Sequence, residues 1–292
     1  MSVIIFRQHN SIMQQNNNKP IILITNDDGI HAPGIHALVE AMRPLGTIVV
    51  VAPDKPQSGM GHAITLNEPL RLKKSNLFGD IEAYACTGTP VDCVKLAKDK
   101  ILHKKPQLCV SGINHGSNSS INIIYSGTMS AAMEAGIEGI PAVGFSLLNY
   151  AIDADFTSAA HYAAKIAEQV LQHGLPQNTL LNVNIPYLPI DEINGMRICR
   201  QAHAKWEEEY DERLDPHGRP YYWLTGNFVN YDGGDDTDEW ALSHGYVSIV
   251  PVQYDLTAHQ AIAFFHKNWS LYQTKSPHDI HLDNSDTFND LG

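Results

Sequence analysis

Short, unbroken apolar runs recur along the first two thirds of the chain, and each stops at a polar or glycine-rich segment. The first run begins at Ile21 and ends in the sequence Asn-Asp-Asp-Gly. Apolar runs rich in β-branched residues are typical of strands that are buried on both faces of a parallel sheet. They predict strands starting at residues 21 and 108, and strands over residues 47–51, 142–146 and 180–185.

Segments with helical signals lie between these runs. Helices are expected over residues 33–43, 90–98 and 156–173, and in the Ala- and Met-rich segment after Ser126. Thr89 and Pro90 suit an N-cap and a first-turn proline, and Gly174 suits a helix stop. Alternating strands and helices predict an α/β fold with a doubly wound, mostly parallel sheet in a three-layer, Rossmann-like arrangement. No Gly-x-Gly-x-x-Gly follows the first strand, which argues against a dinucleotide cofactor.

The pattern changes after Pro186, where aromatic side chains gather among charged and turn residues. Residues 246–250 alternate like a strand, and the Gly- and Asp-rich residues 232–239 predict a solvated loop, with a second metal site as the alternative. Exposed aromatic residues need a partner, so we expect a β-rich C-terminal extension with oligomerisation arms. The expected division is a disordered extension (1–19), a catalytic core (20–185), the C-terminal extension (186–274) and a polar tail (275–292).

The composition allows a sizeable core, because 43% of the residues are apolar. Lys and Arg number 20 against 32 Asp and Glu, which gives a formal net charge of −12. This charge argues against binding to duplex nucleic acid, which requires a basic face. It leaves single nucleotides open as substrates, because a bound metal and helix N-termini can neutralise one phosphate locally.

The sequence also indicates where the protein resides. No apolar stretch approaches the length of a membrane-spanning helix, and residues 1–20 lack the apolar centre of a signal peptide. The four cysteines have no metal-type spacing, so we expect free thiols in a cytoplasmic protein without membrane contact.

Candidate chemistry lies where the predicted strands end. Asp27 and Asp28 follow the first strand, and ligands of parallel sheets bind beyond the carboxyl ends of the strands. Adjacent carboxylates repel each other unless a cation or a shared proton relieves them, and such ligands suit Mg²⁺ or Mn²⁺. A solvated Asp-Asp-Gly turn is the simpler interpretation.

Two further segments point to the same edge of the sheet. Ser58 and Gly59 lie in a loop after the second strand and could approach a ligand closely, or form only a flexible loop. Asn114 follows the strand that starts at residue 108, and its carbonyl oxygen suits a hard cation or a turn. Its neighbour His115 is more simply a hydrogen-bonded loop histidine.

A helix is expected to begin near residues 126–128. Helix N-termini present free N–H groups and a positive dipole end, which favour phosphate binding. Ser126, Gly127 and Thr128 could therefore hold phosphate, although a plain Ser or Thr N-cap is the alternative.

Together these motifs resemble the survival protein E family of metal-dependent nucleotidases, from about residue 20 to residue 257. One departure is the sequence Ser-Ser-Ile-Asn-Ile at residues 119–123, where many relatives carry a glycine and then an acidic residue. The motifs that carry the resemblance are Thr-Asn-Asp-Asp-Gly (25–29) with Ala-Pro-Gly (32–34), residues 52–65, Gly-Thr-Pro-Val-Asp-Cys-Val (88–94), Ser-Gly-Ile-Asn-His-Gly (111–116), Tyr-Ser-Gly-Thr (125–128), Asp-Thr-Asp (236–238) and Gly-Tyr-Val-Ser-Ile (245–249).

The resemblance implies one divalent cation per subunit, Mg²⁺ or Mn²⁺. It implies metal ligands at Asp27, Asp28, Ser58 and Asn114, and phosphate contacts at Gly59, Asn114, Ser126, Gly127 and Thr128. It also implies C-terminal elements exchanged in a homodimer or homotetramer.

We expect a phosphomonoesterase that converts nucleoside monophosphates to nucleoside and phosphate, that is, a 5′-nucleotidase. Additional 3′-nucleotidase and exopolyphosphatase activities are left open. Asp27, Asp28 and Asn114 are the candidate catalytic residues, and Asp27 is the first candidate for the carboxylate that acts on the attacking water. A covalent aspartyl-phosphate intermediate is also open. Adjacent aspartates argue against the haloacid-dehalogenase scheme, which spaces them Asp-x-Asp. The alternative function is a metal-stabilised nucleotide-binding regulatory module without turnover.

Overall fold

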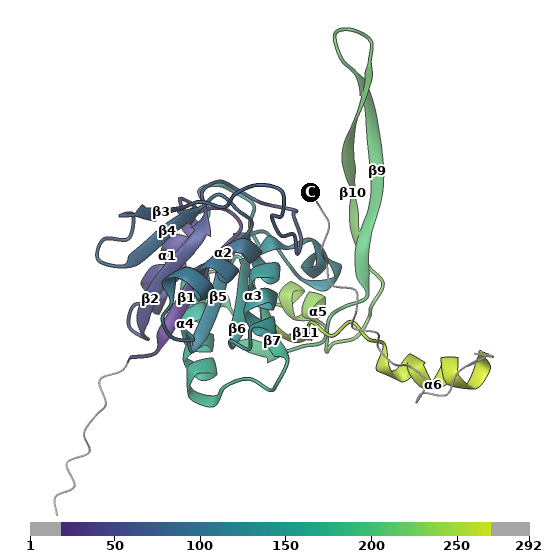
Figure 1. The fold of residues 1–292 in the computed structure, drawn as a ribbon. Helices are drawn as coiled ribbons and strands as arrows, with labels where there is room; N and C mark the ends of the chain where they lie inside the picture. Colours follow the sequence, from purple (N-terminus) through teal and green to yellow (C-terminus); the bar gives the residue numbers. More distant parts are fainter. Residues whose placement is uncertain (1–18, 270–292) are drawn as a thin grey trace, which may run out of the picture. The chain divides into compact units, whose positions relative to one another are not determined.

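The computed structural model describes residues 19–269, which divide into two compact units with a boundary between Tyr254 and Asp255. The first unit contains a nine-stranded sheet in the order β3-β4-β2-β1-β5-β6-β7-β11-β8 (Figure 1). The second contains helix α6 (His259–Asn268). The strands of the sheet are β1 (Ile21–Thr25), β2 (Thr47–Pro53), β3 (Leu72–Ser75), β4 (Glu82–Cys86), β5 (Leu108–His115), β6 (Ala142–Leu147), β7 (Thr179–Ile185), β8 (Met196–Ile198) and β11 (Val247–Gln253).

The centre of the sheet is parallel. β1 pairs in parallel with β2 on one side and with β5 on the other, and the parallel pairing continues through β6 to β7. Only β3 and β11 join antiparallel neighbours, β4 and β7. The chain thus runs outward in one direction from β1 to β2 and later resumes on the other side of β1 with β5. This reversal creates a crevice at the carboxyl ends of β1 and β5.

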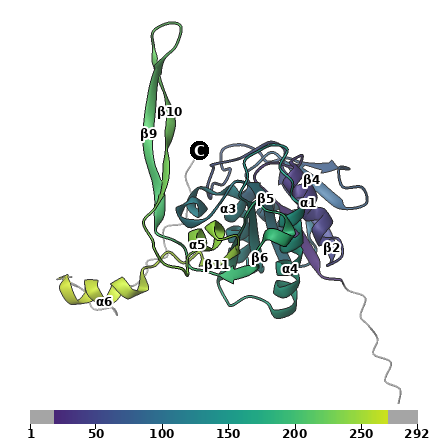
Figure 2. The same cartoon turned by 180° about the vertical axis from the view of Figure 1, so that it is seen from behind.

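Helices cover both faces of the sheet, and each strand contributes alternate side chains to the two cores. Ile22 and Ile24 of β1 pack in the cluster that includes α1 (Pro33–Met42) and α4 (Thr157–His173). Leu23 packs on the opposite face, in the cluster that includes α2 (Pro90–Leu96) and α3 (Gly127–Ile137). The expected α/β fold with a doubly wound, mostly parallel sheet in three layers is therefore confirmed (Figures 1 and 2).

Several local signals have the predicted effect. Thr89 caps α2 in a reciprocal capping box with Asp92, and Gly174 ends α4 with a φ of 72°. The helix that starts at Pro90 ends at Leu96 and continues as a wider turn over Ala97–Ile101. All four cysteines are free, as expected, and all four are buried.

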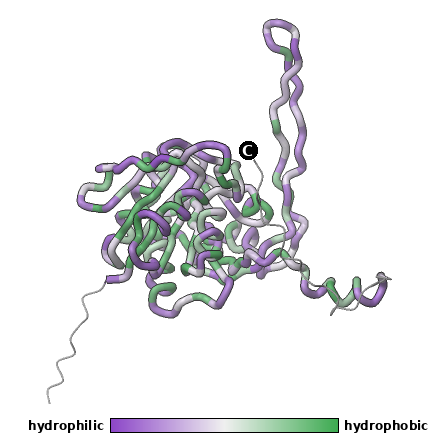
Figure 3. Tube along the Cα trace, in the orientation of Figure 1, coloured by the Kyte–Doolittle hydropathy of each residue, from purple (hydrophilic) through white to green (hydrophobic). Residues whose placement is uncertain are grey.

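A long two-stranded hairpin, β9 (Ala204–Leu214) and β10 (Pro220–Asn230), projects from the first unit. Most of its residues are exposed, and Figure 3 shows that its far end is largely hydrophilic. The sequence pattern did not predict these strands, nor β3, β4, β8, α5 (Asp238–Ser243) or α6. A β-rich segment does follow β7, but β8 and β11 from that segment lie in the main sheet.

The predicted domain division remains a prediction. The expected polar tail and all but one residue of the expected N-terminal extension lie outside the described residues. Within residues 19–269, no helix is both long and apolar enough to cross a membrane.

Candidate functional site

The crevice begins with a sharp turn at the carboxyl end of β1. Thr25 is in register with Ser111 of β5, so the residues after both strands meet at one edge of the sheet. The Asn26 side-chain amide donates to the carbonyl oxygen of Gly29 at 2.9 Å and closes the turn. Gly29 has a φ of 93°, and a Cβ there would lie 3.2 Å from the Lys55 carbonyl carbon. Glycine therefore lets the turn pack against the loop after β2.

Asp27 lies directly beneath the N-terminus of α3. Its carboxylate Oδ1 accepts a hydrogen bond from the Thr128 hydroxyl. A Cβ on Gly127 would lie 2.7 Å from the Asp27 Cβ, so only glycine allows this approach. Ser126 is the N-cap of α3, and its Oγ accepts from the Met129 N–H at 3.0 Å. Asp27 and the first turn of α3 thus form one packed group.

The two carboxylates are held in an unfavourable electrostatic state. Asp27 is 4% exposed, and burial, together with the charge of Asp28, raises its pKa to about 6. Burial also raises the pKa of Asp28. Among the residues that the structure describes, neither aspartate forms an ion pair with Lys, Arg or His. A cation bound from solution would relieve both the burial and the mutual repulsion.

Asn114 is brought to the same place by an irregularity in β5. The pairing of β5 with β6 shifts between Ser111 and Asn114, next to Gly112, which has a φ of 130°. The Asn114 amide nitrogen donates to the carbonyl oxygens of His115 and Gly116, at 3.0 and 2.9 Å. These bonds orient the side chain and leave its Oδ1 available as an acceptor. The His115 N–H lies 3.3 Å from Asp28 Oδ2, which places Asn114 beside the aspartates.

The loop after β2 approaches the site through its backbone. The Gln57 N–H donates to the Asp27 carbonyl oxygen at 2.7 Å, and Ser58 and Gly59 follow as exposed residues. The returning limb of the loop is anchored at His62, whose Nε2 lies 3.0 Å from Glu134 Oε2 on α3. The predicted site residues are therefore gathered around the ends of β1, β2 and β5 and the start of α3.

The donor set fits a hard divalent cation. Asp27 supplies a buried carboxylate, Asp28 a half-buried carboxylate, Asn114 a free amide oxygen and Ser58 a hydroxyl in the adjoining loop, all of which are ligand types that Mg²⁺ and Mn²⁺ accept. In residues 19–269, no group of three or more His, Cys, Asp and Glu side chains could hold a metal ion. A metal at this edge would thus depend on the Ser and Asn oxygens as well. The individual ligand roles stay predictions.

The prediction of a solvated loop over residues 232–239 is wrong for Thr237 and Asp238, which are both fully buried. The Asp238 carboxylate accepts from the Ser120 N–H at 2.7 Å and from the Ala202 N–H at 2.9 Å. It thereby ties the base of the hairpin to the segment that leads into Ser126. A Thr that precedes two acidic residues is an N-cap signal, and it could have indicated the start of α5.

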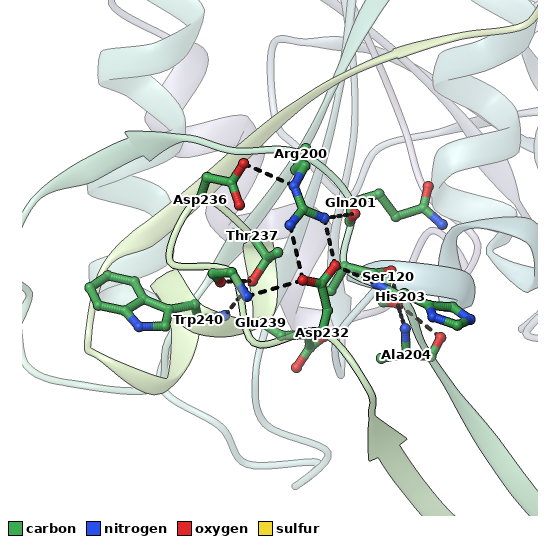
Figure 4. A network of polar contacts seen from close by, with 12 residues as sticks. Ser120, Arg200, Gln201, His203, Ala204, Asp232, Asp236, Thr237, Glu239 and Trp240 are labelled. Atoms are coloured by element: carbon green, nitrogen blue, oxygen red, sulfur yellow. Dashed lines mark hydrogen bonds and ion pairs between the residues drawn. The ribbon is translucent and has the colours of Figure 1, made fainter.

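The alternative of a second metal site in this loop is not supported by its contacts. The Arg200 guanidinium lies between Asp232 and Asp236, with N–O distances of 2.5 and 2.9 Å (Figure 4). These two carboxylates are paired with a protein cation, in contrast to Asp27 and Asp28.

Comparison with known proteins identifies related sequences. Residues 22–208 match the family model described as survival protein SurE. A protein of Flavobacterium psychrophilum named 5′-nucleotidase SurE is 62% identical over 255 residues, which cover 87% of this chain and 99% of the relative. A protein of the same name from Cytophaga hutchinsonii is 58% identical over 253 residues, which cover 86% of this chain and 98% of that protein. The crystal structure of the SurE protein from Aquifex aeolicus is 42% identical, with a TM-score of 0.75, and covers 85% of this chain and 99% of that one.

Proposed function

Because the chain belongs to the survival protein SurE family, we propose that it is a metal-dependent 5′-nucleotidase that hydrolyses nucleoside monophosphates to nucleoside and phosphate. The observation that carries the proposal is the contact between Asp27 and the first turn of α3. It unites a candidate cation site and a candidate phosphate site in one crevice. The relatives named 5′-nucleotidase SurE support the same reaction class.

Asp27, Asp28, Ser58 and Asn114 would hold one Mg²⁺ or Mn²⁺ per subunit. When bound, the cation would supply positive charge that polarises a phosphoryl oxygen and lowers the pKa of water. The Gly127 N–H, the Ser126 hydroxyl, the Asn114 side chain and the backbone at Gly59 would bind the phosphate oxygens, helped by the positive end of the α3 dipole. Thr128 is also a proposed phosphate contact. In addition, its hydroxyl donates to the Asp27 carboxylate and orients it.

Asp27 is the candidate base that accepts a proton from the attacking water. It is rigidly oriented by Thr128 and by the close approach of Gly127, as a general base must be. Asp28 and Asn114 complete the proposed catalytic group, since the His115 N–H contacts Asp28 and fixes it beside Asn114.

The decisive experiment measures phosphate release from a nucleoside 5′-monophosphate by metal-depleted protein. We expect activity to return with Mg²⁺ or Mn²⁺ and to disappear with excess chelator. Asp28→Asn should lower Mn²⁺ affinity, measured by calorimetry, and activity together, whereas the exposed Asp191→Asn should change neither. Full activity in chelator would refute the metal assignment. Nucleotide binding without phosphate release under any metal would favour the regulatory module.

We further propose a cytoplasmic homodimer or homotetramer. Four free cysteines suit a reducing compartment. The exposed Tyr222 and Trp223 on the hairpin support an assembly in which another subunit covers the hairpin.

A further inference from the structure

A cleft of about 370 Å³ lies between the hairpin and the short helical segment Ser120–Tyr125, which leads into α3. One wall carries Tyr125, and the other is formed by the two hairpin strands. Two of its aromatic residues are well exposed, Tyr125 at 55% and Trp206 at 41%. The lining residues are Tyr125, Trp206, Glu208, Leu224, Thr225 and Gly226.

The hairpin is shaped to leave this space open. Glu208 is directly opposite Gly226, and the next pair on the same face towards the root of the hairpin is Trp206 with Phe228. Gly226 has a φ of 132°, and a Cβ there would lie 2.2 Å from the Glu207 carbonyl oxygen. The backbone therefore excludes any side chain at this position. The result is a gap beside the indole of Trp206.

Trp206 is held in place. Its Nε1 donates to the Asn122 Oδ1 at 2.8 Å, and its ring packs edge-on against Phe228 with centroids 5.6 Å apart. A fixed and exposed indole is a ready surface for stacking a flat ring, because little side-chain entropy is lost on binding.

The cleft is next to the proposed phosphate site. Tyr125 directly precedes Ser126, the N-cap of α3. The loop that carries Ser58 also reaches this segment, since a Cβ on Gly61 would lie 3.4 Å from the Ile124 carbonyl oxygen. A phosphate bound at Ser126 would therefore leave the rest of its nucleoside close to Tyr125.

We propose that this cleft binds the base of the substrate, stacked on Tyr125 and Trp206, with Glu208 as the specificity-determining residue. The inference rests on the proposed nucleotidase function. Glu208 forms no ion pair in the part of the chain that the structure describes, so its carboxylate is free to accept a hydrogen bond. An exocyclic amino group, as on adenine or cytosine, satisfies this acceptor, whereas the carbonyl oxygen at the same place on hypoxanthine or uracil repels it.

The test compares AMP, IMP and ribose 5-phosphate, which has no base and no aromatic ring. Wild-type protein should prefer AMP over IMP in kcat/KM. Trp206→Ala should raise KM for AMP about tenfold, the order expected for one base stacked on an aromatic ring, and leave KM for ribose 5-phosphate unchanged. Glu208→Gln should reduce the ratio of AMP to IMP about tenfold, as one base-edge hydrogen bond would predict. The matched control is Tyr221→Ala, because Tyr221 is an exposed aromatic residue that pairs with Arg213 on the opposite face of the hairpin.

Binding of adenosine to metal-depleted protein, followed by saturation-transfer NMR, separates this proposal from the proposed function. Adenosine binding that is lost in Trp206→Ala would support the cleft even if no ester were hydrolysed. Hydrolysis of AMP and IMP at equal rates, without adenosine binding, would overturn the cleft and leave the nucleotidase intact. Equal losses for AMP and ribose 5-phosphate in Trp206→Ala, or a lower solution mass with unchanged KM, would also overturn it. The last result would make the cleft a contact with a second copy of the chain.

Discussion

The hydroxyl of Thr128, in the first turn of α3, donates a hydrogen bond to the carboxylate of Asp27, at the end of β1. These residues are 101 positions apart in the sequence. The bond favours the ionised form of Asp27 and works against the burial that raises its pKa. It connects the residue that we assign to the metal with the helix that we assign to the phosphate.

Thr128→Val should weaken phosphate binding about tenfold, because a cation bound at Asp27 would release the Thr128 hydroxyl to donate to phosphate, and valine lacks this donor. It should also raise the pKa of Asp27 above about 6, since the hydroxyl that lowers it is gone. Calorimetry with inorganic phosphate and NMR titration of the Asp27 carboxyl would measure the two effects. Thr128→Ser is the control, because it keeps the hydroxyl. If Thr128→Val lost metal affinity and kept phosphate affinity, the two roles would be reversed.

Asp27→Asn should stabilise the metal-free protein at pH 8, by up to about 3 kcal/mol, while it abolishes metal binding. Burial raises the pKa of Asp27 from 3.8 to about 6, so the ionised carboxylate destabilises the fold above pH 6. The stability of metal-free wild-type protein should therefore fall as the pH rises through 6. The difference from Asp27→Asn should vanish below about pH 4. Urea unfolding in chelator across this range would reveal the effect, and identical curves at pH 8 would contradict it.

Glu134→Ala should lower the free energy of unfolding by about 1–2 kcal/mol at pH 7, because a buried carboxylate that pairs with Lys95 and hydrogen-bonds to His62 is removed. Glu134 is 3% exposed, and its carboxylate oxygens lie 2.5 Å from Lys95 Nζ and 3.0 Å from His62 Nε2. Hydrogen bonding to His62 lowers its pKa, so this contribution is present above about pH 4.5 and is lost as the pH falls.

Glu138→Ala is the matched control for this helix, since Glu138 is more exposed and pairs only with Lys98 among the described residues. We expect a loss below about 1 kcal/mol there. Thermal unfolding of both variants at pH 7 and pH 4 would decide the comparison. Equal losses in the two variants would show that the contacts of Glu134 have no special weight.

The full-length protein should be a homo-oligomer at micromolar concentration, with the exposed Tyr222 and Trp223 of the hairpin covered by another subunit. Light scattering would measure its mass. Replacing the part of the hairpin beyond Gly226 and Glu208 with a short turn should reduce that mass and leave the sheet intact, because these residues pack mainly against each other. A well-behaved full-length monomer would contradict the prediction.

Local sequence determined the elements at the centre of the fold. The apolar run at Ile21 is short, rich in β-branched residues and followed by the turn sequence Asn-Asp-Asp-Gly, which favours a buried strand over a helix, and it forms β1. Thr89 and Gly174 act within one helical turn of their own positions, so their effects could be predicted without knowledge of distant contacts.

Local sequence signals do not predict the hairpin strands or the burial of Asp238. β9 reads Ala-Lys-Trp-Glu-Glu-Glu-Tyr-Asp-Glu-Arg-Leu, which has no apolar run, and Glu208 and Glu212 interrupt the alternation of apolar and charged residues. It forms a strand because β10 pairs with it. The Gly- and Asp-rich sequence around Asp238 predicts a solvated loop. In the structure Ser120 and Ala202, which are distant in sequence, supply the N–H groups that satisfy its buried carboxylate.

For the site, the sequence by itself determined that Asp27, Asp28, Ser58, Asn114 and Ser126 all follow or precede regular elements of a parallel sheet, so that they share one edge. Only the tertiary structure decided that Thr128 bonds Asp27 and that Gly127 rests on it. It also decided that the Asn114 oxygen is left free, because the carbonyl groups of His115 and Gly116 bind its nitrogen. The reason is physical: a strand end places a backbone, whereas the direction and ionisation of a side chain depend on which distant atoms surround it.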